Sequence, residues 1–79
     1  MRVPRDVNAD EIVKLLVKYG YIVIRQTGSH IRLSKKTDEG ASTITIPNHK
    51  PIKIGTLQSI VKDICSFNQL VINEIYRQL

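Results

Sequence analysis

The residues best suited to chemistry in this chain lie in one short stretch near its middle. Gly28-Ser29-His30 is typical of a tight turn that leads into a β-strand, with His30 as the first strand residue. Arg32 follows two positions later and therefore lies on the same face of that strand. An imidazole can give or accept a proton near neutral pH, and a guanidinium binds phosphate well. The stretch therefore predicts proton transfer beside a bound phosphate.

His49 and Ser29 are two further candidate residues, and neither decides the role of His30. His49 stands between Pro47 and Pro51 in a predicted rigid loop, where it is a second proton-transfer group, a phosphate contact or an ordering element of the loop. Ser29 adjoins His30, but adjacent strand residues point to opposite faces and no carboxylate is near to orient the imidazole, which disfavours a Ser/His nucleophile. On spacing and charge alone, a histidine that caps a turn or is merely exposed is the commoner case, and one that only binds RNA is a further alternative.

Positive charge is concentrated around the same stretch. The chain carries a net charge of +5, and residues 25–53 contain six basic side chains against two acidic ones, whereas the remainder is nearly balanced. A phosphate backbone is the partner that such a patch favours, and a solvated basic surface is the alternative. The candidate RNA contacts are the basic, turn and loop residues of this region: Arg25, Gly28, Ser29, Arg32, Lys35, Lys36, His49, Lys50 and Lys53.

The elements that position these residues are predicted from their periodicity. After an extended lead-in over residues 1–7, Asn8 and Glu11 form a capping-box pattern, and apolar residues at helical spacing predict a helix over residues 9–19 that Gly20 ends. β-branched residues and turn residues predict the sheet: strands over 21–26, 30–34 and 42–46, a turn at 27–29 and a polar hairpin loop at 35–41. A second helix is predicted to begin between residues 54 and 56, and Ser66 with Gln69 to open a third that runs to residue 79.

Together these elements predict one α+β domain over residues 1–79. The order is α-β-β-β-α-α, with a three-stranded antiparallel sheet and helices on one of its faces. The side chains expected under the helices are Ile31, Leu33, Ile44 and Ile46. The side chains expected on the open face are His30, Arg32, Ser34, Thr43 and Thr45. His30 and Arg32 are therefore predicted to face a macromolecule rather than the core.

Composition argues against several other classes. No apolar run approaches the ~20 residues that cross a bilayer, and residues 1–8 lack the apolar core of a signal peptide, so we expect a cytoplasmic protein that does not enter a membrane. Cys65 is the only cysteine and is expected to be a buried helix residue. One cysteine and two histidines nineteen positions apart do not form a plausible metal-ligand set, so no metal or small-molecule cofactor is expected.

Four blocks of sequence are similar in order and spacing to the HicA-type (HicA/YcfA-like) toxin family. They are Tyr19-Gly20-Tyr21, Arg25-Gln26-Thr27-Gly28-Ser29-His30, Ile46-Pro47-Asn48-His49-Lys50-Pro51 and Ile54-Gly55-Thr56-Leu57-Gln58-Ser59-Ile60. The resemblance covers roughly residues 4–67. It implies a fold like that of double-stranded-RNA-binding domains and a metal-independent mRNA interferase of a type II toxin–antitoxin pair. It also implies a HicB-type antitoxin that covers the active face.

The resemblance assigns the catalytic role to His30. It implies a close approach of the RNA backbone at Gly28, where a glycine can take a positive φ. Ile31 follows His30 where the family often has a histidine or aromatic residue, and a side chain directed into the core leaves the chemistry intact. Residues 68–79 extend beyond the family core; we expect them to complete the hydrophobic core, with dimerisation or antitoxin contact as the alternatives. The alternatives are a non-catalytic RNA-binding module that uses the same face and an interaction protein whose basic face meets an acidic partner.

Overall fold

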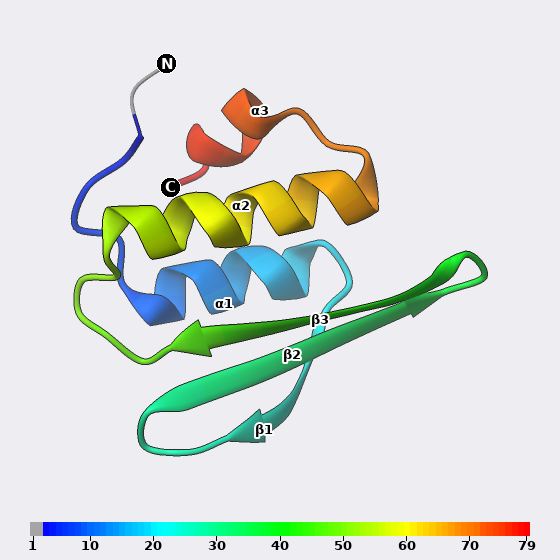
Figure 1. The fold of residues 1–79 in the computed structure, drawn as a ribbon, viewed down its shortest axis with the longest axis horizontal. Helices are drawn as coiled ribbons and strands as arrows, with labels where there is room; N and C mark the ends of the chain where they lie inside the picture. Colours follow the sequence, from blue (N-terminus) through cyan, green and yellow to red (C-terminus); the bar gives the residue numbers. More distant parts are fainter. Residues whose placement is uncertain (1–2) are drawn as a thin grey trace.

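Three antiparallel strands and three helices make up the fold. The computed structural model describes residues 3–79, so the first two residues of the predicted lead-in lie outside it. The elements follow in the order α1 (Ala9–Lys18), β1 (Ile22–Gln26), β2 (His30–Thr37), β3 (Gly40–Pro47), α2 (Ile54–Asn68) and α3 (Ile72–Tyr76). The sheet order is β1-β2-β3, and α1 and α2 lie along one side of it (Figure 1). This confirms the predicted α+β arrangement, which is also the one that the resemblance implies.

The first helix begins as predicted and is one residue shorter. The Glu11 carboxylate accepts a hydrogen bond from the backbone N–H of Asn8 at 2.9 Å, so the capping pattern does fix the start of α1. Tyr19 caps the helix, and Gly20 has a φ of +97°, which a residue with a side chain adopts only at a cost. The chain then turns so sharply that β1 begins at Ile22, one residue later than predicted.

Tyr21, expected in the first strand, is instead a core residue. The residue is 2% exposed, and its hydroxyl lies 2.8 Å from Ser42 Oγ and accepts a hydrogen bond from Asn68 Nδ2 at 3.2 Å. These contacts join the end of α1, the sheet and the end of α2. The interpretation of Tyr19 and Tyr21 as core and rim rather than base-stacking groups is therefore consistent with their burial.

The β2–β3 hairpin is longer than predicted, and the predicted loop over residues 35–41 is wrong. Only Asp38 and Glu39 separate the two strands, and Lys35, Lys36 and Thr37 pair with Ser42, Ala41 and Gly40 respectively. The hairpin end extends past the helices (Figure 1). Lys35 still contacts Asn68 at the end of α2, but the ladder beyond it needs no apolar alternation, and its polar sequence resembles a loop.

The third helix does not begin where the capping pattern placed it. Ser66 lies inside α2, which continues to Asn68 and ends at Gln69 with a left-handed φ of +56°. The Leu70 N–H then bonds to the Cys65 carbonyl at 2.9 Å, a typical helix-ending contact. A serine and a glutamine three positions apart also occur in a helix interior, so the pattern alone was ambiguous.

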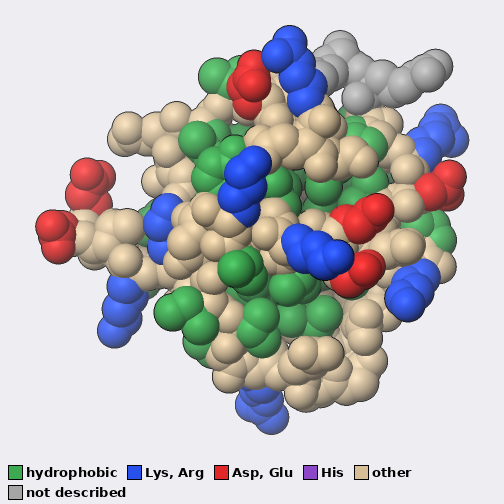
Figure 2. All heavy atoms as spheres, turned by 180° about the vertical axis from the view of Figure 1, so that it is seen from behind, with side chains coloured by type: hydrophobic (Ala, Val, Ile, Leu, Met, Phe, Trp, Pro, Cys, Tyr) green, Lys and Arg blue, Asp and Glu red, His purple; other side chains and the backbone are tan. Residues whose placement is uncertain are grey.

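The core lies between the sheet and the helices, and other apolar side chains stay outside it. The buried apolar residues include Val7, Ile12, Leu16, Tyr21, Ile31, Leu33, Ile44, Ile46, Ile52, Leu57, Val61 and Ile64. In β1, by contrast, Ile22 is 68% exposed and Ile24 is 56% exposed. Seen from behind, hydrophobic side chains gather in the lower middle of the molecule, and no histidine is visible there (Figure 2).

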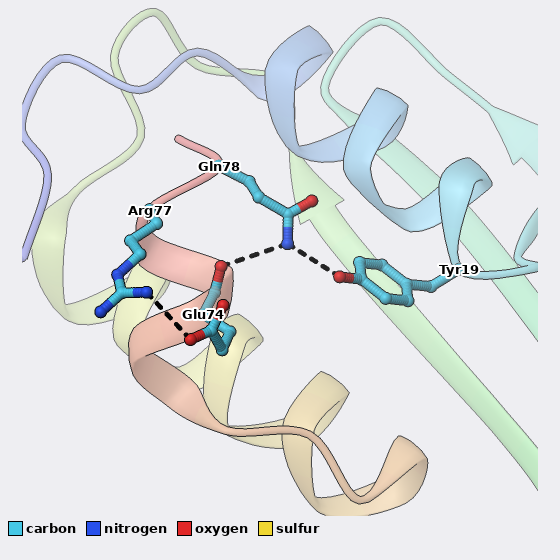
Figure 3. A network of polar contacts seen from close by, with 4 residues as sticks. All are labelled: Tyr19, Glu74, Arg77 and Gln78. Carbon is cyan, nitrogen blue, oxygen red and sulfur yellow. Dashed lines mark hydrogen bonds and ion pairs between the residues drawn. The ribbon is translucent and has the colours of Figure 1, made fainter.

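The C-terminal residues complete the core, as expected. Ile75 in α3 is fully buried, and α3 packs on α2. The Gln78 side chain donates one hydrogen bond to the Tyr19 hydroxyl at 2.8 Å and another to the Glu74 carbonyl at 3.1 Å (Figure 3). Lys18 donates to Gln78 Oε1 at 2.7 Å. The end of the chain is thus attached to the end of α1.

Candidate nucleic-acid interface

The open face of the sheet carries the side chains that alternation predicted for it. Ile31 and Leu33 of β2 are at most 6% exposed, whereas His30 and Arg32 are exposed. The same division separates the buried Ile44 and Ile46 of β3 from its exposed threonines. Ile31, which stands where the family often has an aromatic residue, does point into the core. His30 and Arg32 therefore lie together on the face that no helix covers.

Strand register adds a second row of side chains beside Arg32. Residues directly opposite in an antiparallel pair share a face. Arg32 pairs with Thr45 of β3 on one side and with Arg25 of β1 on the other. The irregularity between Val23 and Arg25 produces the second pairing. The exposed guanidinium groups of Arg25 and Arg32 and the hydroxyl of Thr45 thus form one row across the sheet, next to the row that contains His30.

The turn that delivers His30 is held by its own hydrogen bonds. The His30 N–H donates to Thr27 Oγ1 at 3.1 Å, and the Thr27 N–H donates to the His30 carbonyl at 2.9 Å. Thr27 thus uses both a side-chain and a backbone group to close the turn. Sequence reasoning assigned no function to Thr27, although a threonine at the start of a glycine-containing turn is the available signal.

Asn48 ties this turn to the loop after β3. His30 pairs with Pro47, so the two segments lie side by side. The Asn48 N–H donates to the Ser29 carbonyl at 2.9 Å, and Asn48 Nδ2 lies 3.4 Å from the Gly28 carbonyl. Sequence reasoning missed Asn48, because only the register of β2 and β3 reveals which loop residue meets the turn.

Ser29 and His30 are closer than strand alternation suggests. Ser29 Oγ lies 3.0 Å from His30 Nδ1, within hydrogen-bond distance. The prediction that the two side chains point apart was wrong, because Ser29 belongs to the bend before β2 rather than to the strand. Within the described residues, no acidic side chain is bonded to the imidazole, so the arrangement lacks the third member of a Ser/His/Asp triad.

Gly28 does not adopt the conformation that the resemblance implies. Gly20 and Gly40 are the glycines with positive φ in the described chain, and Gly28 is not among them. A Cβ added at Gly28 meets nothing within 4 Å. The space beside Gly28 is open to solvent, which is compatible with a close approach of a ligand backbone.

The predicted lysines are divided between the two faces. Lys36 continues the outward series of His30 and Arg32 and is exposed. Lys35 lies on the helix side, where its ammonium donates to Asn68 Oδ1 at 2.6 Å and stands 5.9 Å from the centre of the Tyr21 ring. The structure therefore does not bring Lys35 together with His30.

The remaining candidates lie in the connection from β3 to α2. His49 and Lys50 are exposed loop residues, and Lys53 is the N-cap residue of α2. The His49 carbonyl accepts a hydrogen bond from the N–H of Ala9 at 3.3 Å, which joins this loop to the start of α1. His49 is adjacent to Asn48 and hence to the turn of His30, although the described structure contains no hydrogen bond between the two histidines.

Other features of the described surface lie away from His30. Open hollows of about 330 and 470 Å³ are lined by residues around Lys35 and around Lys14 respectively, and His30 lines neither. In residues 3–79, no group of three or more potential ligands is placed to hold a metal ion. None of the helices there has the length and apolar character needed to span a bilayer. Burial raises the pKa of the Cys65 thiol, which is the behaviour of a structural cysteine.

Comparison with known proteins gave one finding. The family model described as HicA toxin of bacterial toxin-antitoxin matches residues 9–64, from the first residue of α1 into the last turns of α2. The match includes the turn of His30, the Asn48 loop and both rows of the open face. It ends before α3. Comparisons with curated proteins and with solved structures gave no match.

Proposed function

Because this chain belongs to the HicA toxin family of bacterial toxin–antitoxin systems, we propose that it is an endoribonuclease that cleaves mRNA with His30 as general acid or base. The observation that carries the proposal is the position of His30. It is exposed at the start of β2, on the open face of the sheet, with Arg32 two positions further on. A histidine and an arginine so placed suit phosphodiester cleavage.

The proposed reaction uses a nucleophile that RNA itself supplies. The 2′-hydroxyl attacks the adjacent phosphorus, its proton passes to a base, and the bond from phosphorus to the 5′-oxygen breaks as that oxygen gains a proton. The products are a 2′,3′-cyclic phosphate and a 5′-hydroxyl. His30 performs one of the two proton transfers, and the exposed His49 in the neighbouring loop is the candidate for the other. This route needs no metal ion.

The exposed cations of the open face are proposed to hold the RNA backbone. Arg32 lies two strand residues from His30, about 7 Å along β2. Arg25 stands opposite Arg32, so this pair is proposed to bind the reacting phosphate or the next one along. Lys36, Lys50 and Lys53, with the open backbone at Gly28 and Ser29, extend the proposed path.

A toxin of this kind acts with an antitoxin partner, which we propose to be a HicB-type protein that covers the open face. The charges of Arg25 and Arg32 favour an acidic surface on that protein. The exposed Ile22 and Ile24 of β1 offer apolar contact at the edge of the same sheet. Because the proposed substrate is mRNA, the proposed place of action is the cytoplasm.

The test is cleavage of a single-stranded RNA in EDTA by the wild type and by His30→Ala. General acid–base catalysis contributes about 10²- to 10⁴-fold, so we expect a loss of that size in His30→Ala. Lys62→Ala, a change of an exposed residue on α2, is the control and is expected to cleave normally. Because His30 is exposed, the melting temperature of His30→Ala should match that of the wild type.

Equal cleavage by the wild type and His30→Ala would refute the role of His30. If neither protein cleaves but both bind RNA in a salt-sensitive way, the chain is a non-catalytic RNA-binding module. If neither binds RNA at all, the basic face serves a protein partner. His49→Ala separates the roles of the loop histidine, because a proton-transfer group lowers kcat whereas a phosphate contact raises KM.

A further inference from the structure

The contact between Ser29 Oγ and His30 Nδ1, 3.0 Å long, is the one hydrogen bond that the His30 ring makes within residues 3–79. Nε2 has no protein partner in that part of the chain. The two ring nitrogens therefore differ: one is engaged by the protein, and the other is available to a ligand. In histidines that transfer protons, the bond made by one nitrogen sets the tautomer and orientation in which the other acts.

The backbone beneath this contact is held by several hydrogen bonds. The Ser29 carbonyl accepts from the N–H of Asn48, and the N–H and carbonyl of His30 both bond to Thr27. These hydrogen bonds hold the two consecutive residues that carry the hydroxyl and the imidazole. The turn and the Asn48 loop together thus fix the backbone from which Ser29 Oγ and His30 Nδ1 extend.

We propose that Ser29 is a positioning residue for His30 and that Nε2 is the nitrogen that exchanges the proton, an inference that rests on the proposed function. Because Nε2 exchanges the proton, Nδ1 stays protonated in both ring states, and the Ser29 hydroxyl accepts a hydrogen bond from Nδ1–H in each of them. The hydroxyl therefore holds the orientation of the ring in both states.

The kinetic test compares Ser29→Ala with Ser29→Thr in the full chain. Loss of one hydrogen bond to the ring is expected to lower kcat by about five- to tenfold while KM stays the same, since the hydroxyl acts on the ring and not on the RNA. Ser29→Thr keeps the hydroxyl and is expected to restore most of the rate. Wild-type cleavage by Ser29→Ala overturns the proposal, as does a loss that Thr does not rescue.

A second measurement does not depend on cleavage. Long-range ¹H–¹⁵N spectra of the histidine rings report the tautomer of His30, with His49 as the internal control. We expect Ser29→Ala to shift the ring nitrogen signals of His30 and leave those of His49 in place, and Ser29→Thr to preserve both. An unchanged His30 ring in Ser29→Ala overturns the inference. If the ring shifts but His30→Ala still cleaves RNA, the contact is real and it is the proposed catalytic function that fails.

Discussion

Arg32 and Lys35 carry the same charge three positions apart on β2, and the structure predicts opposite consequences for their loss. Arg32 is exposed on the open face beside His30. Lys35 faces the helices, bonded to Asn68 at 2.6 Å and set against the Tyr21 ring. Arg32→Ala should therefore weaken RNA binding with little change in stability, whereas Lys35→Ala should reduce stability with little change in RNA binding.

The size of each effect follows from these contacts. A phosphate contact to single-stranded RNA contributes about 0.7 to the slope of log K against log salt. Arg32→Ala should lower that slope by this amount, so the ratio of wild-type to variant affinity should fall by about 2.6-fold between 50 and 200 mM salt. The half-buried hydrogen bond of Lys35 and its cation–π contact together contribute about 1–2 kcal/mol. For a domain of this size, that corresponds to a fall in Tm of roughly 4–16 °C.

Both variants are best made in the His30→Ala background, so that the RNA survives the titration. Fluorescence anisotropy of a labelled single-stranded RNA across a salt series gives the slope, and thermal unfolding gives Tm. Arg77→Ala, which removes the exposed arginine that follows α3, controls for the loss of one positive charge. Equal slopes for Arg32→Ala and the parent would show that the open face does not hold phosphate. An equal loss of slope in Lys35→Ala would show that global charge, and not the face, decides binding.

Two further predictions follow from backbone geometry and burial. Gly20→Ala should lower the free energy of unfolding by about 1–3 kcal/mol, because Gly20 has a φ of +97° and Lys35 lies within 3.3 Å of the added Cβ. Gly28→Ala should leave the free energy of unfolding unchanged or raise it by up to about 1 kcal/mol, because Gly28 has neither a positive φ nor a close neighbour. Denaturant unfolding of both variants measures the contrast. A Gly28→Ala variant that is clearly destabilised would contradict this prediction. Burial raises the pKa of the Cys65 thiol above its ordinary value near 9, so the folded chain holds this proton more tightly than the unfolded chain. The stability that this shift contributes is present below pH 9 and is lost as the pH rises through the higher pKa of the folded chain. Unfolding curves at pH 7 to 10 should therefore show a fall in the free energy of unfolding, and this fall should be smaller in Cys65→Ala. An equal fall in the wild type and in Cys65→Ala would refute the prediction.

Most of the fold was predictable because its signals are local. Asn8 with Glu11 marks the start of α1, and the alternation from His30 to Leu33 separates the two faces of β2. The same alternation, continued past residue 34, would have placed Lys35 under the helices and Lys36 on the open face. It was not continued because the polar sequence after Ser34 resembles a loop. The predicted end of the second strand was therefore wrong, and this error led to the prediction that Lys35 contacts RNA.

The contacts around His30 were not predicted for a different reason. They depend on the register with which β2 pairs with β3. The predicted strand ends, residues 34 and 42, would pair Ile31 with Thr45 and so bring an inward residue opposite an outward one. The structure pairs Ser34 with Thr43 and His30 with Pro47 instead. Only this register brings Asn48 against the turn at Ser29. Hydrophobic matching across the hairpin therefore contains the missing information, provided that the loop length is left free.

The register that positions His30 is enforced by the core rather than by the site. A slip of one residue would bring His30 and Arg32 under the helices and expose Ile31 and Leu33, each of which contributes about 1.5–3 kcal/mol by its burial. It would also remove the backbone bond from Asn48 to Ser29. The helices on one side of the sheet thereby fix the geometry of the other side. The site itself then has few contacts, which are the hydrogen bonds of Thr27 and Asn48 to the turn and of Ser29 to the His30 ring.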